Sequence, residues 1–456
     1  LTVRVRAAHE TQSSPMEVSG EEQHFDNDAT RTDWSLAPRL THTLRPGLRL
    51  EARLYGSGYR TRTDLVGQED GTLLSRSRYD QRYGKAEAQV QAVLTERHLL
   101  TAGAGFVSET VDADRLVGER TGGFAFVQDE WQAASRLDLV PSVRLDAHSD
   151  YATRVSPKLA ALATPADGLR LRASVGSGYK APDFRQLYLS FTNASAGYSV
   201  FGAEEVREGL ARLDRQGQIQ AYLTDPEALG AAIEAERSLA VNVGFDLDLA
   251  SGVSVRLNGF HNEVRDLIDT QPVARKTNGQ QVFTYFNRGR VFTRGLEAEL
   301  RWRSSRALEA ALGYTLLDAK DRDVLDDLAD GRIYRRNESG RDVVVPSTDY
   351  GGLPGRSRHS GTLRLRHEHA LLGLTTNVQA RYRGRYAFAD RNGNGIVDVD
   401  SEYAPGYAVL DVTLTKTLFA DHALQVGVEN LTGHTDPQYV PFLSGRKWFA
   451  GLRLRF

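Results

Sequence analysis

Hydrophobic and polar residues alternate along most of this chain, in segments of roughly ten to twenty residues. Leu48, Leu50 and Leu54, for example, alternate with Arg49 and Arg53. Successive side chains of a β-strand point to opposite faces, so each such segment has one apolar and one polar face. The pattern predicts about eighteen strands, the first running outward and the last running inward.

The last segment, residues 446–456, combines this alternation with charge. Its two faces are Trp448, Ala450, Leu452, Leu454 and Phe456 on one side and Lys447, Gly451, Arg453 and Arg455 on the other. An arginine turned into hydrocarbon at the bilayer centre would cost about 2–4 kcal/mol. We therefore expect the apolar face to meet lipid and the arginines to face a wet interior. A half-buried strand of a soluble protein would alternate too, so this segment alone leaves both interpretations open.

Short and long connections between the segments alternate along the chain. The short ones lie near residues 45–46, 96–97, 135–136, 165–167, 250–251, 305–306, 370–371 and 420–421. The long ones cover roughly residues 11–31, 63–75, 113–120, 179–235, 269–280, 320–356, 388–405 and 432–444, with a brief one near Asp150. A meander with all its long connections at one end is typical of outer-membrane barrels. We predict an all-β transmembrane antiparallel β-barrel with long extracellular loops.

Composition agrees with this prediction and excludes several classes. There is no run of about 18 apolar residues, as a membrane helix would need. The chain has no Cys, which excludes disulfides and thiolate metal sites, and its net charge of -2 argues against nucleic-acid binding. Aromatic residues near strand ends are expected to form an interfacial girdle; they are Trp34, Tyr55, Tyr59, Trp131, Trp302, Tyr314, Tyr382 and Trp448.

The connection 179–235 is the longest and interrupts the alternation. Residues 202–215 and 224–237 read as two short helices, the second with Thr224 or Asp225 as N-cap and Pro226 in its first turn. Helices inside a large extracellular loop indicate a folded lid. A mobile polar loop is the alternative.

Several stretches resemble the barrel of TonB-dependent outer-membrane receptors. They are residues 126–131 (FVQDEW), 143–146 (VRLD), 156–159 (SPKL), 172–182 (RASVGSGYKAP) with Leu187 and Tyr188, 287–289 (NRG), 294–297 (RGLE), 354–359 (PGRSRH), 430–432 (NLT) and 444–446 (SGR). Their order along the chain is also similar to that of the family.

This resemblance implies a 22-stranded plugged barrel, of which about 18 strands are present here. The family's N-terminal plug and energy-coupling box have no counterpart before the first strand, so we interpret residues 1–456 as the barrel domain of a longer or truncated chain. A second departure follows Pro182, where the family's short return turn is replaced by the helical insert and only residues 236–238 are similar to that return.

One loop has the spacing of a calcium site. Oxygen-bearing side chains alternate from residue 390 with Gly395 in the sixth place, as in the first half of an EF-hand loop. The candidate ligands are Asp390, Asn392, Asn394, Asp398, Asp400 and Glu402. The twelfth place is Ser401, so the bidentate carboxylate would come from a neighbour. A polar Asn-Gly turn without a metal is the alternative.

Arginines and aromatic residues in the outer loops are candidates for ligand binding. Guanidinium groups grip anions through several hydrogen bonds, and aromatic rings stack on aromatic ligand groups. The candidates are Phe184, Tyr188, Phe191, Tyr198, Arg207, Arg335, Arg336 and His434. Solvated loop charge, balanced by acidic neighbours such as Asp326 and Asp327, explains the arginines equally well.

The resemblance implies a receptor that takes up a scarce nutrient, a ferric siderophore or a cobalamin-like corrinoid, with energy supplied by TonB through the plug. Outer-membrane lipid and a surface lipoprotein are the further partners expected, and calcium is the one cofactor considered. No grouping of nucleophile, base and acid emerges, so we do not expect an enzyme. A passive porin-like channel or an adhesin, without an energised gate, is the alternative.

Overall fold

The computed structural model describes residues 1–16, 24–114, 116–193, 197–230, 232–249, 252–304, 307–419, 422–440 and 443–454. One sheet contains 21 strands, and three of them are short strands of an outer loop: β10 (Ser190–Thr192), β11 (Ser199–Phe201) and β12 (Ile219–Tyr222). Eighteen long strands remain, which confirms the predicted number.

The long strands pair antiparallel with their neighbours in the chain. They are β1 (Thr2–Met16), β2 (Phe25–Arg45), β3 (Leu48–Gly67), β4 (Leu73–Thr95), β5 (His98–Ala113), β6 (Leu116–Ala134), β7 (Leu137–His148), β8 (Arg154–Ala166), β9 (Leu169–Lys180), β13 (Glu236–Leu249), β14 (Val253–Lys276), β15 (Gln281–Arg303), β16 (Leu308–Asp321), β19 (His359–His369), β20 (Leu374–Arg383), β23 (Tyr407–Thr417), β24 (Ala423–Glu429) and β25 (Lys447–Arg453).

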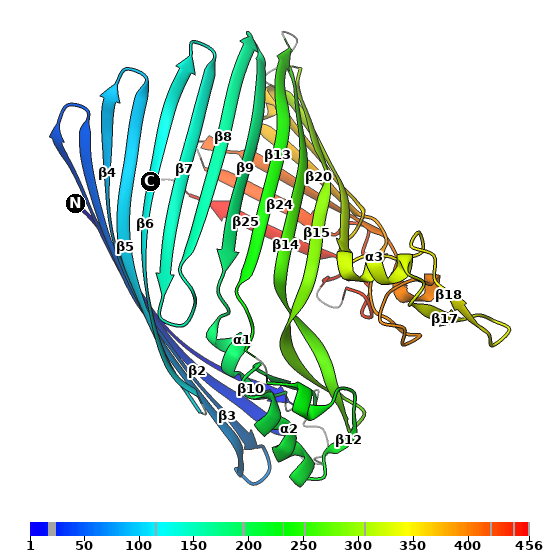
Figure 1. Cartoon of the computed structure of the whole chain (residues 1–456). Helices are drawn as coiled ribbons and strands as arrows, with labels where there is room; N and C mark the ends of the chain where they lie inside the picture. Colours follow the sequence, from blue (N-terminus) through cyan, green and yellow to red (C-terminus); the bar gives the residue numbers. More distant parts are fainter. Residues whose placement is uncertain are drawn as a thin grey trace.

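The sheet curls round on itself, with its short turns at one end and its long connections at the other (Figure 1). β24 and β25 lie behind β9 and β13 in this view, across the interior of the curved wall. Within the described residues, no pairing joins β1 to β25. The short connections predicted at residues 250–251, 305–306 and 420–421 lie outside the described residues, as do Arg455 and Phe456.

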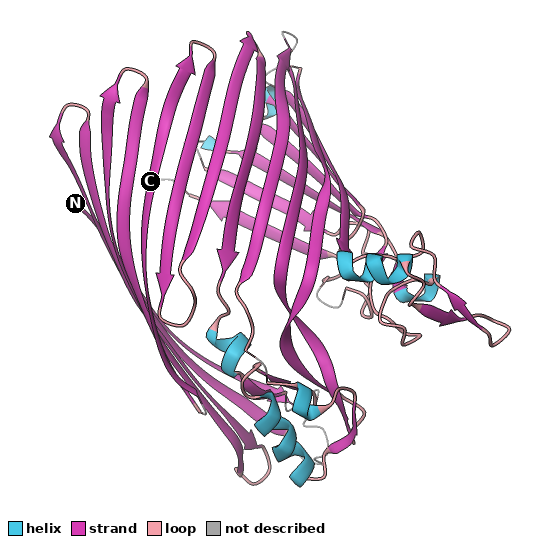
Figure 2. Ribbon diagram, in the orientation of Figure 1, coloured by secondary structure: helices cyan, strands magenta, loops and turns pink. Residues whose placement is uncertain are grey.

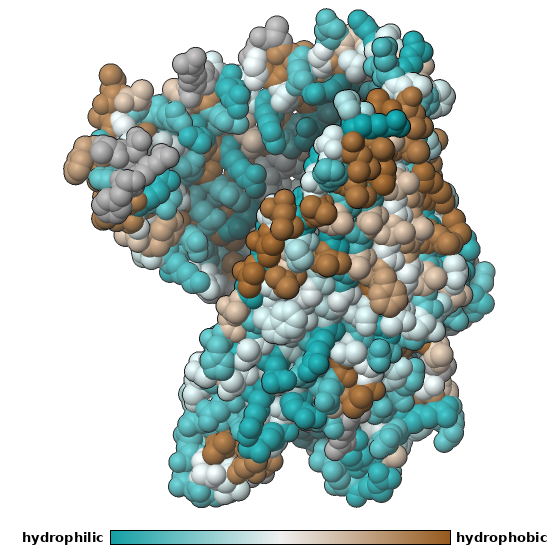
Figure 3. All heavy atoms as spheres, turned by 90° about the vertical axis from the view of Figure 1, so that its left-hand side faces the viewer, coloured by the Kyte–Doolittle hydropathy of each residue, from teal (hydrophilic) through white to brown (hydrophobic). Residues whose placement is uncertain are grey.

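The outer face of the wall is apolar, as the alternation predicts. Leu312 of β16 lies beside Leu300 of β15 and Leu363 of β19, and about half of its side chain (49%) is exposed. On the last strand, Leu452 pairs with Leu424. Figure 3 shows apolar residues gathered on the outside of the upper half, whereas hydrophilic residues line the hollow that opens in this view.

The inner face is charged and its charges are paired. Glu51 of β3 is almost fully buried and accepts hydrogen bonds from Arg39 and Arg53. Further round the wall, Asp246 of β13 accepts bonds of 2.9 Å from both Arg172 and Arg256. A buried carboxylate needs such partners because losing water costs several kcal/mol. The arginines of these strands therefore lie on the inner face with their carboxylates, whereas the inward direction of Arg453 on the last strand stays a prediction.

Several outer connections are shorter than predicted because the strands continue beyond the expected ends. β2 has 21 residues, β4 has 23 and β14 has 24. The predicted long connections 11–31, 63–75, 113–120 and 269–280 are therefore wrong in extent. The prediction was also wrong for two girdle tyrosines: Tyr55 and Tyr59 lie on the inner face, opposite to Trp34, which faces Gly58.

The remaining elements belong to the outer loops or to one turn (Figure 2). They are α1 (Phe184–Tyr188), α2 (Val206–Arg215), η1 (Pro226–Ala228), α3 (Arg322–Ala329), β17 (Tyr334–Arg336), β18 (Asp342–Val344), η2 (Ala370–Leu372), β21 (Tyr386–Ala387), η3 (Asp400–Glu402) and β22 (Tyr403–Ala404). None of the helices in the described part of the chain is long and apolar enough to cross a membrane.

The first of the two helices predicted in the long loop is present and the second is wrong. α2 begins at Val206 rather than Gly202. In the second region Asp225 caps one 3-10 turn and Pro226 starts it. The turn ends at Leu229, whose backbone is extended (φ −90°, ψ 172°), and Gly230 follows with a φ of +74°. Arg237 already belongs to β13.

Candidate functional site

The largest outer loop, residues 181–235, folds over the outer ends of the strands. We call it the α1–α2 loop. Its main hydrophobic core joins α2 to the tips of β14 and β15; its members are Phe201, Val206, Leu210, Leu213, Leu229, Val273, Ala274 and Val282. A second cluster packs Leu187 of α1 against Ile268 of β14, with Tyr151 and Tyr285 at its edge. The loop is thus a packed body, which favours the predicted lid over a mobile polar loop.

A capping box fixes the short helix α1. The Asp183 carboxylate accepts a bond of 2.8 Å from the Gln186 N–H, and the Gln186 side chain accepts one of 2.9 Å from the Asp183 N–H. These bonds satisfy N–H groups that the first turn of a helix leaves without partners. Phe184 and Leu187 are buried beneath the helix.

The start of the loop is bound to the inner wall by Arg120 of β6. Its guanidinium donates to the Glu109 carboxylate from Nε (2.8 Å) and Nη2 (2.6 Å), and from Nη1 to the carbonyl of Pro182 (2.9 Å). It also lies over the ring of Phe184, at 4.5 Å from the ring centre. The side chains of Arg120 and Glu109 are only 16% and 12% exposed.

The end of the loop is held by Asn287 of β15. Its side-chain oxygen accepts a bond of 2.6 Å from the Glu234 N–H, and its amide donates to the carbonyls of Glu234 (3.0 Å) and Asp266 (2.6 Å). Lys180 and Glu236, the residues that flank the loop, form an ion pair at 3.0 Å. The loop is therefore tied to the barrel at both of its ends.

A cavity of about 550 Å³ lies between α1 and the outer ends of β4, β5 and β6. It combines three guanidinium groups with three aromatic rings; they belong to Arg76, Arg185, Arg212, Tyr79, Phe184 and Tyr188. Asp114 contributes the one carboxylate in this lining. A cationic and aromatic lining of this kind fits an anionic ligand that carries aromatic groups.

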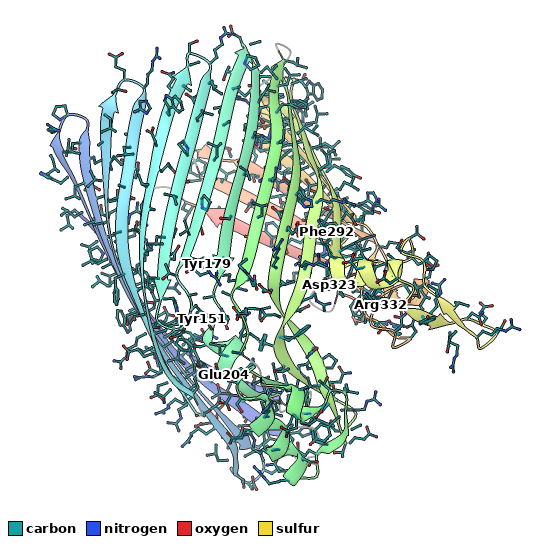
Figure 4. The ribbon with its side chains drawn as sticks, in the orientation of Figure 1. Tyr151, Tyr179, Glu204, Phe292, Asp323 and Arg332 are labelled. Atoms are coloured by element: carbon teal, nitrogen blue, oxygen red, sulfur yellow. The ribbon has the colours of Figure 1, made fainter. Side chains whose placement is uncertain are left out.

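The tyrosines beside α1 stay neutral at physiological pH. Burial raises the pKa of Tyr188, and the nearby Glu204 carboxylate raises it further. Burial, followed by the charge of Asp150, raises the pKa of Tyr151. Figure 4 shows Tyr151 and Glu204 close to α1. Both tyrosines therefore keep a hydroxyl proton that can be donated.

Two of the predicted ligand-binding residues, Phe184 and Tyr188, line the cavity beside α1. Phe191 and Tyr198 meet edge to face at 6.2 Å, and Tyr198 lines a separate open hollow of about 700 Å³. Arg207 donates to the carbonyls of Leu229 and Glu227. It therefore holds the loop together, which is a structural role.

The other three predicted residues belong to a second group of loops, drawn with α3, β17 and β18 in Figure 1. Arg335 bridges the carboxylates of Asp349 (2.9 Å) and Asp398 (3.2 Å). Arg336 is exposed and pairs with Asp342. The ring of His434 stacks on Tyr407 with ring centres 5.2 Å apart. This group has its own small core, formed by Leu328, Val345, Tyr350 and Ile396.

Two of the predicted calcium ligands, Glu402 and Asp400, already have other partners. Glu402 accepts backbone N–H groups from Arg391, Asn392, Asp398 and Val399 at 2.8–3.2 Å. Asp400 is 94% exposed and pairs with Arg385.

The remaining carboxylates of this loop are also engaged. Asp390 accepts the N–H groups of Gly393 and Gly395, both at 2.7 Å. Asp398 accepts the side-chain amides of Asn392 (2.8 Å) and Asn394 (3.2 Å). Among the described residues, no three or more Asp, Glu, His or Cys side chains are grouped so as to hold a metal. The geometry fits the hydrogen-bonded turn better than the metal, and the calcium site stays a prediction.

Sequence reasoning missed Arg76, Tyr79, Arg120 and Arg185. Arg76, Tyr79 and Arg120 lie in strands near their outer ends. The alternation predicts whether each side chain points inward or outward, but it does not predict which loop packs over it. Arg185 follows Phe184 directly in the recognised stretch and could have been included with it. Arg120 has no local signal, because its partners lie 11 and 62 residues away in the chain.

Comparison with known proteins matches residues 7–431 to the family model "TonB dependent receptor-like, beta-barrel". The chain belongs to this family. It is therefore a bacterial outer-membrane β-barrel protein, of a family whose members are receptors or transporters and not enzymes.

Individual relatives are distant. An iron-regulated outer membrane virulence protein of Vibrio cholerae is 23% identical over 342 residues, which is 73% of this chain and 44% of the relative. The chain thus spans less than half of the length of that relative.

Solved structures share the fold of this TonB-dependent receptor barrel. The copper transporter OprC matches with a TM-score of 0.67 at 13% identity, over 99% of this chain and 75% of its own. The siderophore receptor PirA from Acinetobacter baumannii gives 0.61 at 15% identity, over 99% and 70%. A mutant of the ferric enterobactin receptor from Pseudomonas aeruginosa, in complex with enterobactin, gives 0.61 at 14% identity, over 99% and 70%.

Proposed function

We propose that this barrel belongs to a receptor that captures a ferric siderophore at its outer end, and that TonB-supplied energy acting on a plug drives its uptake. The observation that carries the proposal is the cavity beside α1, with its three guanidinium groups and three aromatic rings. Siderophore receptors among the related structures support the same ligand class. The apolar outer face would contact outer-membrane lipid.

The chemistry of the cavity favours a catecholate ligand. A ferric tris-catecholate is an anion whose outer surface is made of aromatic rings. Arg185 and Arg212 would bind its charge, Tyr79, Phe184 and Tyr188 would contact its rings, and Arg76 would line the site while it stays paired with Asp64 (2.7 Å). A corrinoid carries no comparable concentration of negative charge, so this lining supports it less. A surface lipoprotein as a partner stays a prediction.

Binding to the full-length receptor tests the proposal. Ferric enterobactin, a ferric hydroxamate and cobalamin would each be titrated by calorimetry against the detergent-solubilised protein. We expect the catecholate to bind most tightly. Replacing Arg185 by Gln should weaken its binding about tenfold, because a charge-assisted hydrogen bond contributes about 1.5–3 kcal/mol. Arg336→Gln is the matched control, an exposed arginine of the other loop group.

Transport assays separate a receptor from a passive channel. Cells that carry the full-length receptor but lack TonB should bind the ligand and fail to accumulate it. Uptake that persists without TonB would support the porin-like alternative. Binding of cobalamin in preference to the catecholate would overturn the ligand assignment.

A further inference from the structure

Arg120 joins three strands of the wall to the first turn of the α1–α2 loop. Gln81 of β4 donates to one oxygen of Glu109 of β5 (2.5 Å), and Arg120 of β6 grips the other oxygen through two nitrogens. The third guanidinium nitrogen reaches the Pro182 carbonyl. One side chain thus connects β4, β5 and β6 to the residue that precedes the α1 capping box.

The ring of Phe184 packs between Gly118 and the guanidinium group of Arg120. A Cβ added at Gly118 would fall 2.6 Å from Cε1 of Phe184, so the ring lies directly over the glycine. The Arg120 guanidinium lies over the same ring at 4.5 Å. Phe184 is 6% exposed. Gly118 and Arg120, two residues apart on β6, therefore fix both the position and the tilt of the first residue of α1.

Stability alone does not account for this arrangement. Taking both charges of an ion pair out of water costs about as much as their attraction returns, so a buried pair contributes little net stability while it fixes geometry. Arg144 of β7 provides the contrast: it binds Asp146 through two nitrogens and lies over Phe124, yet it is 42% exposed and its hydrogen bonds remain on its own strand.

The contacts of Arg120 lie immediately before residues that line the cavity. Pro182 and Phe184 precede Arg185 and Tyr188, which both face the cavity beside α1. On the opposite side of α1, Leu187 packs against Ile268. The C-terminal end of α1 is also held by the N–H groups of Ala203 and Glu204, which donate to the carbonyls of Gln186 and Leu187 (both 2.9 Å). Arg120 holds the N-terminal end, at the β6 side. Without Arg120, this N-terminal end could move away from β6 and withdraw Arg185.

We propose that Arg120 is a positioning residue of the ligand site: through Glu109 and Pro182 it locks α1 in the orientation that presents Arg185 and Tyr188 to the ligand. The part of this inference that concerns ligand rests on the proposed function. The part that concerns the position of α1 does not.

Hydrogen exchange and ligand binding, measured on the same variants of the full-length receptor, test the two parts separately. Arg120→Met keeps an unbranched apolar stem and removes the charge and all of the donors. We expect amide exchange in residues 183–190 to accelerate about tenfold, since the helix loses a charge-assisted attachment. Exchange in β5 and β6 should be unchanged. Affinity for ferric enterobactin should fall by a similar factor.

Two further variants distinguish the loss of this attachment from a general loss of folding in Arg120→Met. Arg120→Lys keeps the charge but cannot grip Glu109 and Pro182 together, so intermediate effects are expected. Gly118→Val fills the slot of Phe184 and should reproduce the exchange result with Arg120 intact. Arg144→Met is the control and should leave exchange in α1 unchanged.

The outcomes are distinct. Unchanged exchange of α1 in both Arg120→Met and Gly118→Val would overturn the inference, whatever the ligand results. Faster exchange with unaltered affinity would also overturn it, because the position of α1 would then not matter for binding. If the unmutated receptor fails to bind the catecholate, the proposed function fails, and the exchange data still decide whether Arg120 locks α1.

Discussion

The ring of Phe124 on β6 lies against the backbone of Gly105 on β5, inside the barrel wall. A Cβ at Gly105 would fall 2.4 Å from Cζ of Phe124 and 2.7 Å from the carbonyl oxygen of Ala86. Phe124 is 8% exposed, and Lys85 and Arg144 lie over its ring. The missing side chain at residue 105 is thus what allows an aromatic ring to lie flat on the polar inner face.

Gly105→Ala should therefore destabilise the barrel. Neither the backbone of Ala86 nor the ring of Phe124 can move freely, so overpacking of about 1–3 kcal/mol is expected. The loss would appear as a lower midpoint in the heat-dependent mobility shift of the folded barrel on gels. Gly451→Ala on β25 is the control, because nothing lies within 4 Å of a Cβ at that position. Equal midpoints for the two variants would contradict the prediction.

A second prediction concerns Asn430, which organises the connection between β24 and β25. Its side chain donates to the carbonyls of His434 (2.7 Å) and Ser444 (2.9 Å) and accepts from the His434 N–H and the Thr432 hydroxyl. Its φ is +50°, a left-handed conformation that Asn tolerates better than most residues.

Asn430→Ala should cost about 1–3 kcal/mol, because it removes four side-chain hydrogen bonds from the connection and adds backbone strain at a positive φ. Denaturant unfolding measures the cost. Asn258→Ala is a suitable comparison, since Asn258 makes one long side-chain bond of 3.3 Å to Glu297. It should change the free energy of unfolding by less than about 0.5 kcal/mol. If Asn430→Ala behaved like Asn258→Ala, the assigned role of Asn430 would be wrong.

The wall could be predicted from the sequence because each strand carries its own pattern. Leu312 and its neighbours Leu300 and Leu363 show alternation before any pairing is known, and the alternation also assigns Tyr55 to the face of Arg49 and Arg53. The girdle prediction for Tyr55 was wrong because it relied on the position of this residue near a strand end. The alternation, which places its side chain on the inner face, was not applied to it.

The site could be predicted only in part, because it depends on contacts between distant segments. Phe184 and Tyr188 could be predicted as aromatic residues of the longest outer loop, but the pairing of Arg120 with Glu109 requires the register of two strands and the path of a loop. The helix predicted at residues 224–237 failed for a similar reason: Gly230 in a left-handed conformation lets Leu229 join the core of α2 instead.

The third prediction is a pH dependence of the loop that contains Glu402. Burial raises the pKa of this carboxyl, but four backbone N–H donors outweigh burial and lower it below the ordinary value of 4.5. A group whose pKa is lowered by folding stabilises the folded loop above its unfolded pKa. That stability is lost as the pH falls through the folded value.

Amide exchange in residues 384–406, corrected for intrinsic rates, should therefore accelerate below about pH 4.5. Glu402→Gln should abolish this dependence and loosen the loop at neutral pH, since its amide cannot accept all four bonds. Asp400→Asn, at a side chain that is 94% exposed, should leave the profile as it is. A profile in Glu402→Gln that matches the unmutated protein would refute the assignment.

The last prediction concerns calcium. The spacing of residues 390–402 predicts a calcium site, whereas the hydrogen bonds of the loop favour a turn without a metal. Calcium needs six to eight oxygen ligands around one point. Here Asp390, Asp398 and Glu402 are engaged by backbone, amide or guanidinium donors, and Asp400 points to solvent. The Arg335 guanidinium, at 3.2 Å from Asp398, would place a positive charge beside a bound ion.

We therefore expect calorimetric titration of the metal-stripped receptor with calcium to give no binding heat from this loop. Chelation should likewise leave its unfolding midpoint unchanged. The informative comparison is Asp390→Asn, which keeps the acceptor oxygen for one glycine N–H and removes a charge that calcium would require. Heat in the unmutated receptor that disappears in Asp390→Asn would establish a calcium site and show that the loop rearranges around the ion. Heat that persists in the variant would place calcium elsewhere on the receptor.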